Sequence, residues 1–81
     1  MSDMQEEIFD YITSTLENHV DNTAVDSVSE ESELLSILGT HDKVNEFLSD
    51  IKEGADVSFK NDKIVTIRDL VEEIDKAQQS R

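Results

Sequence analysis

The chain has 81 residues, of which 20 are acidic and 7 basic, giving a formal net charge of −13 at pH 7. Nucleic-acid phosphates and anionic membranes attract Lys and Arg and repel this charge, so we predict a basic protein partner rather than nucleic acid or membrane. The length predicts one small domain, residues 1–81, and the lack of cysteine excludes disulfides, a thiol nucleophile and cysteine-based zinc sites.

The first predicted element is a helix from Ser2 or Asp3, either of which can cap it, to about His19. Its apolar residues recur every three or four positions and therefore share one helical face: Met4, Ile8, Tyr11, Ile12 and Leu16. The next segment, 21–29, is polar apart from a few small aliphatic residues. This composition predicts a loop held in place by the side chains of Ala24, Val25 and Val28.

The N-terminal stretch MSDMQEEIFDY has neither the positive segment nor the apolar run of a secretory signal. No apolar stretch approaches the length that a membrane span requires. We therefore expect a cytoplasmic location, and we expect the protein to act as a monomer.

The central segment carries the longest apolar pattern, with residues that recur every three or four positions without a break: Leu34, Ile37, Leu38, His41, Val44, Phe47, Leu48 and Ile51. One helix from about Glu33 to Lys52, capped by Ser29 or Ser32, accounts for all of them. On this helix His41 belongs to the apolar stripe and is predicted to be a partly buried core residue, whereas His19 has no clear partner.

Two glycines bear on the ends of this helix. Gly39 inside a helix costs about 1 kcal/mol relative to Ala. The alternative is that Gly39 ends one helix and a second begins at Thr40 or Asp42; we prefer the single helix. Gly54 is expected to end it as a C′ glycine.

The C-terminal part predicts a short element followed by a final helix. Val57 and Phe59 have the spacing of a short extended or single-turn element. The final helix has one apolar face, formed by Ile64, Ile67, Leu70, Val71 and Ile74. Thr66 is its expected cap, and Asp69 stands three residues later at the capping-box spacing. The fold class is therefore all-α: a small four-helix bundle of three main helices plus a short third helix.

Two stretches carry a resemblance to a known family. DVSFKNDKIVTIRDLVEEI, residues 56–74, resembles the acid, polar turn, K-I-x-T-[VI] and helix of acyl and peptidyl carrier proteins. EEIFDYITSTL, residues 6–16, is similar to their first helix. The resemblance covers nearly the whole chain and implies an acyl-carrier-protein-like bundle.

The resemblance also implies a function. Carriers tether acyl, aminoacyl or polyketide intermediates as thioesters of a covalent 4′-phosphopantetheine, in fatty acid, polyketide or nonribosomal peptide biosynthesis. The implied protein is not an enzyme, because the chemistry belongs to the arm and to partner enzymes. Its partners would be basic surfaces of biosynthetic enzymes and a phosphopantetheinyl transferase.

The family places its attachment serine in D-S-L at the start of the second helix, and this chain contains no D-S-L. Counting from the two end motifs puts Ser36 at this site, with Leu35 in place of the acid. On a continuous helix Ser36 lies at the edge of the apolar stripe near an N-terminus that favours phosphate, and it is our predicted attachment residue. Matching L-G to Leu38-Gly39 instead puts Asp42 there, or Lys43 with a shift of one residue. Neither of these can form the phosphodiester, and both registers stay open.

Acids on the exposed face of the second helix are the predicted docking residues, since the resemblance implies contact between such acids and enzyme Arg and Lys side chains. They are Glu33, Asp42, Glu46 and Asp50. Two other functions fit the same surface: an armless adaptor with a carrier fold, or an acidic inhibitor that binds a basic protein. No catalytic residue is predicted, and no metal site either, because DNTAVD lacks the glycine and final glutamate of a calcium-binding loop.

Overall fold

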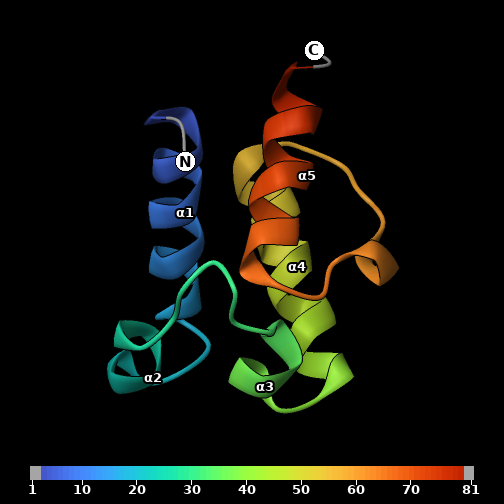
Figure 1. The fold of residues 1–81 in the computed structure, drawn as a ribbon. Coiled ribbons are helices and arrows are strands. Elements are labelled where there is room, and N and C mark those ends of the chain that lie inside the picture. The colour runs from blue at the N-terminus through green and yellow to red at the C-terminus, as the bar shows by residue number, and fades with distance from the viewer. Residues whose placement is uncertain (1–2, 80–81) are drawn as a thin grey trace.

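Three amphipathic stretches of the sequence form the three long helices of the bundle, α1 (Asp3–Leu16), α4 (His41–Ala55) and α5 (Ile67–Gln79) (Figure 1). Shorter elements connect them: α2 (Asn22–Asp26), α3 (Leu34–Leu38) and the 3₁₀-helix η1 (Asn61–Lys63). The computed structural model describes residues 3–79. Ser2, one expected cap of the first helix, and the side chain of Ala24 lie outside the described part.

The predicted all-helical bundle is confirmed in residues 3–79, where no strand forms and a single antiparallel bridge pairs Glu33 with Thr66. Figure 1 shows α4 and α5 running in the same direction and α1 running in the opposite one. The short third element is displaced from its predicted position: Val57 and Phe59 lie in neither a helix nor a strand, and the helical turn η1 follows them. The region predicted as a loop over 21–29 contains the short helix α2, whose Val25 is buried as expected.

The core forms where the apolar faces of the long helices meet. Its fully buried side chains come from α1, α3, α4 and α5: Ile12, Leu16, Leu34, Phe47, Leu48, Ile51, Ile67, Leu70 and Ile74. No polar or charged side chain is buried among the described residues. Apolar burial at about 25 cal/mol per Å² is therefore the main stabilising contribution.

The prediction of one continuous helix from Glu33 to Lys52 is wrong, because the chain breaks at Gly39 and Thr40. Gly39 has a φ of 97°, a backbone conformation that glycine adopts without the penalty of a Cβ. Thr40 is the N-cap of α4, and its Oγ1 accepts a hydrogen bond from the Lys43 amide at 3.2 Å. Gly39 thus ends one helix and Thr40 begins the next, and these two local signals outweigh the unbroken apolar spacing.

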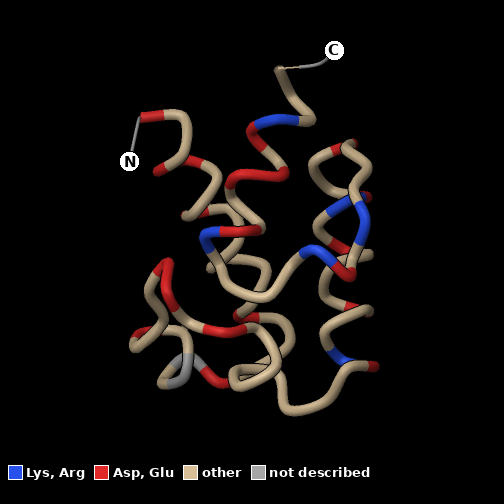
Figure 2. The backbone as a smooth tube through the Cα atoms, turned by 45° about the vertical axis from the view of Figure 1, so that its right-hand side comes forward, with Lys and Arg blue, Asp and Glu red and all other residues tan. Residues whose placement is uncertain are grey.

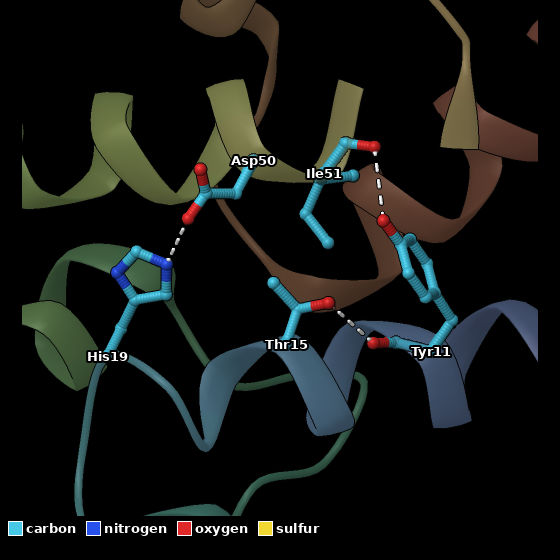
Figure 3. Close-up of polar contacts among 5 residues, drawn as sticks. All are labelled: Tyr11, Thr15, His19, Asp50 and Ile51. Atoms are coloured by element: carbon cyan, nitrogen blue, oxygen red, sulfur yellow. Dashed lines mark hydrogen bonds and ion pairs between the residues drawn. The ribbon is translucent and has the colours of Figure 1, made fainter. Parts of the chain in front are cut away.

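The prediction that Gly54 ends the second helix is also wrong. Helix α4 continues to Ala55, and the C-cap is Asp56 with a φ of 54°. A Cβ on Gly54 would lie 2.0 Å from the Tyr11 hydroxyl, so the glycine allows the Tyr11 side chain of α1 to pack against α4. The same hydroxyl donates a hydrogen bond to the Ile51 carbonyl at 3.4 Å (Figure 3).

The segment before α3 is fixed to the start of α5 by main-chain hydrogen bonds. The Ile67 amide donates to the Ser32 carbonyl at 3.0 Å, and the Arg68 amide donates to the Glu30 carbonyl at 2.8 Å. The Arg68 guanidinium also donates to the Glu30 carboxylate, and this bond, together with the Glu30 charge, raises the pKa of Arg68 above its ordinary value. These contacts hold the segment before α3 against the start of α5.

The predicted capping box at the start of α5 is confirmed. The Asp69 amide donates to Thr66 Oγ1 at 3.2 Å, and the Thr66 amide donates to the Asp69 carboxylate at 3.1 Å. The same carboxylate also accepts from the Val65 amide at 3.1 Å. Amides that no helical carbonyl can reach are therefore satisfied within the local sequence.

Candidate functional site

The exposed face of α4 brings together three of the predicted docking acids, Asp42, Glu46 and Asp50. They follow one another at intervals of four residues, so they lie on one side of the helix, and all three are exposed. Glu53 continues the stripe and is exposed as well. We call Asp42, Glu46, Asp50 and Glu53 the α4 acidic stripe.

Glu33 does not belong to this stripe. It is exposed, but it stands at the N-cap position of α3, on the other side of the break at Gly39. Figure 2 shows how few basic positions accompany the acidic ones along the backbone. Among residues 3–79, Asp42 and Glu46 form no ion pair.

Asp50 differs from the other acids of the stripe because it has a partner from another part of the chain. His19 Nε2 lies 2.7 Å from its carboxylate (Figure 3). The imidazole also packs edge-on against Phe47, with ring centroids 5.5 Å apart. The His19 side chain is only 18% exposed, whereas Asp50 is 56% exposed. The contact anchors the segment after α1 to α4 and leaves most of the Asp50 carboxylate facing solvent.

The second histidine corrects another prediction. His41 is exposed, not partly buried, because it is the first residue of α4 and does not continue the apolar face of a longer helix. His41 matches the three-to-four-residue spacing of the apolar residues only by chance.

Ser36, the predicted attachment residue, is the third residue of α3 and is exposed. It borders a shallow groove of about 300 Å³ whose lining residues are Ser27, Val28, Ser32, Glu33, Ser36 and Ile37. Helix α3 has 5 residues, so its macrodipole contributes little to binding a phosphate. The phosphate-binding position predicted for Ser36 requires the N-terminus of a much longer helix.

Asp42, the residue of the alternative register, has a different environment. It lies in the first turn of the 15-residue helix α4. A carboxylate is favoured at this positive end of a helix by about 0.3–1 kcal/mol. The position is therefore well suited to a fixed negative charge.

Metal sites and membrane spans were also sought within the described range. No group of three or more His, Asp or Glu side chains within residues 3–79 is arranged to hold a metal ion. None of the helices described there combines the length and apolar character needed to cross a membrane. No family model, no curated protein and no solved structure matches the chain.

Proposed function

We propose that the protein is a non-enzymatic docking module that binds a basic surface of a partner protein through the α4 acidic stripe. The observation that carries the proposal is the presence of Asp42, Glu46 and Asp50 on one exposed face of a long helix. A helix holds such charges in a fixed array, which suits recognition of Lys and Arg on a complementary surface.

The energetics of the stripe support binding. Like charges four residues apart destabilise a helix by about 0.2–0.5 kcal/mol per pair. Asp42 and Glu46 form such a pair, with no compensating ion pair among residues 3–79. A basic partner would relieve this repulsion, and the net charge of −13 would speed its association.

The resemblance to carrier proteins fits this proposal in an armless form. The element order of a long helix, a long connection, a second long helix, a short turn and a last helix is similar to that of carriers. Leu38 and Gly39 stand just before Thr40, the N-cap of α4, as L-G stands before the attachment serine in the family. In this register Asp42 replaces the attachment serine, and its carboxylate cannot carry the arm.

Reversing two charges of the stripe, Asp42→Lys with Glu46→Lys, is expected to abolish capture of the partner from a lysate of the source cells by the immobilised protein. Capture of the same partner by the wild type should fall as salt rises, because exposed charges are screened. Asp50 is left unchanged because its contact with His19 supports the fold.

The matched control carries Glu17→Lys and Asp62→Lys, two exposed acids outside the stripe, and has the same net charge. Circular dichroism checks that both variants stay helical. Equal loss of capture in the two variants would mean that overall charge, and not the α4 acidic stripe, determines binding.

A second function is favoured by one observation, the exposure of Ser36 beside a groove. In this alternative Ser36 carries phosphopantetheine, and the arm lies along the apolar side chains of Val28 and Ile37. The acid that precedes the serine in carriers is replaced by Leu35. The two functions differ in a covalent modification that mass spectrometry detects directly.

Under the docking proposal, incubation with coenzyme A and a broad-specificity phosphopantetheinyl transferase should leave the intact mass of the wild type unchanged. The variant Leu35→Asp, which restores the acid before Ser36, should also stay unmodified. His41→Asp with Asp42→Ser, which restores Asp-Ser at the start of α4, is the variant that we expect to gain the arm.

A known carrier in the same reaction controls for transferase activity. A mass gain in the wild type that Ser36→Ala removes would overturn the docking proposal in favour of the Ser36 alternative. A gain in Leu35→Asp alone would mean that the serine is in register and that only its neighbouring acid has been lost.

A further inference from the structure

We infer that the partner also inserts one large apolar side chain into a cleft between α1, the end of α4 and α5. The inference rests on the proposed function, because it adds an apolar anchor to a contact made by charge. The cleft has a volume of about 230 Å³, and its lining is mostly apolar: Met4, Glu7, Ile8, Tyr11, Gly54, Ala55, Ile74 and Gln78.

The cleft has an exposed apolar side chain on one wall and a buried apolar side chain on another. Met4 is 51% exposed, and of the exposed large hydrophobic side chains in residues 3–79, Met4, Leu35 and Val65, it alone lines this cleft. Ile74 contributes a buried wall. Methionine is flexible and polarisable, so it adapts to an incoming apolar group.

Gly54 lets the Tyr11 side chain pack directly against the end of α4, and both residues line the cleft. Any side chain at this position would meet the Tyr11 hydroxyl, since even a Cβ would lie 2.0 Å from it. The Tyr11 hydroxyl meanwhile stays fixed by its bond to the Ile51 carbonyl at 3.4 Å.

The rim of the cleft is negative. Glu7 is part of the lining, and Asp3 and Asp10 precede and follow it on the same side of α1. The C-terminus of α4, the negative end of its dipole, adjoins the cleft through Gly54 and Ala55. An apolar group flanked by Lys or Arg complements this rim.

The size and charge of the cleft decide among its possible occupants. Pockets that bind drug-sized ligands have volumes of about 300–1,000 Å³, so this cleft is better matched to one side chain. A second copy of the chain would bring another net charge of −13 against the acidic rim. The occupant that fits is a basic amphipathic helix with a large apolar residue at the centre of one face.

The test uses a synthetic Ala-based helical peptide with Lys along one face and a single Trp at the centre of the other. The protein contains no Trp, so peptide fluorescence reports directly on burial of the anchor. We expect a blue shift on binding, and affinity about tenfold higher than that of the same peptide with Ala in place of Trp, as for a central anchor residue.

Protein variants locate the contact. Met4→Gln should remove most of the tenfold difference between the two peptides, whereas Leu35→Gln, at a residue that is 41% exposed elsewhere, should keep it. Glu7→Gln should weaken both peptides, with Glu17→Gln as the matched control. A peptide with Glu in place of Lys should not bind.

The outcomes separate this inference from the proposed function. Equal affinity of the Trp and Ala peptides, with binding lost in the Asp42→Lys, Glu46→Lys variant, would overturn the cleft and leave docking through α4 intact. Binding that depends on Trp and Met4 but not on those two acids would support the cleft and overturn docking through the stripe. An unshifted Trp spectrum would also overturn the cleft.

Discussion

Leu48→Ala is expected to lower the free energy of unfolding by about 2–5 kcal/mol, the usual cost of emptying a fully buried leucine site. The Leu48 side chain is 0% exposed and belongs to the face of α4 that contacts the core. A chain of 81 residues at about 0.05–0.15 kcal/mol per residue has a total stability of about 4–12 kcal/mol. One substitution would therefore remove a large part of it.

Urea unfolding followed by circular dichroism measures this effect. Leu35→Ala is the control, because Leu35 is 41% exposed and its truncation should stay within about 0.5 kcal/mol. If both leucine variants lost equally little stability, the packing of α4 against α1 and α5 would be wrong.

Gly39→Ala is expected to destabilise the protein by about 1–3 kcal/mol, because alanine would have to adopt a φ of 97°. A Cβ at this position meets no other atom within 4 Å, so the cost is purely conformational. Were 33–52 one continuous helix, the same substitution would stabilise it by about 1 kcal/mol through helix propensity. The sign of the change therefore distinguishes the two arrangements.

Thr40→Ala provides a second measurement at the same break. Loss of the cap should cost about 0.5–2 kcal/mol, and Thr40→Ser, which keeps the oxygen, should cost much less. Chemical denaturation of the Gly39 and Thr40 variants under the same conditions gives both values. A stabilising Gly39→Ala together with a neutral Thr40→Ala would restore the continuous helix.

The parts of the fold that the sequence predicts correctly depend on local spacing. The apolar faces of α1, α4 and α5 follow the helical period, and the box formed by Thr66 and Asp69 needs residues only three apart. Such features are readable because the interacting groups are close in sequence. The buried faces of the bundle were predictable for this reason.

The local pattern predicts the wrong role for each glycine. It predicts Gly39 inside a helix, but Gly39 ends α3; it predicts Gly54 at a helix end, but Gly54 lies inside α4. The role of Gly54 depends on the ring of Tyr11, a residue of another helix. No local pattern reports such a contact.

The candidate site likewise has one part that follows from local spacing and another that depends on residues far apart in the sequence. The stripe of Asp42, Glu46 and Asp50 follows from spacing, and its exposure agrees with the prediction. The partner of Asp50 was not predictable, because His19 lies 31 residues away in the chain. The predicted place of Ser36 near the N-terminus of a long helix is wrong, because that prediction assumes an uninterrupted helix through Gly39.

The hydrogen bonds that fix residues 30–34 to the start of α5 have a consequence for how this sequence can diverge. They join main-chain atoms, the amides of Leu34, Ile67 and Arg68 to carbonyls of the facing segment, so any side chain compatible with the turn preserves them. Homologues can therefore be expected to exchange residues freely at exposed positions such as Glu31. An insertion or deletion there would shift every donor away from its acceptor, so the length of this segment should be under stronger selection than its composition.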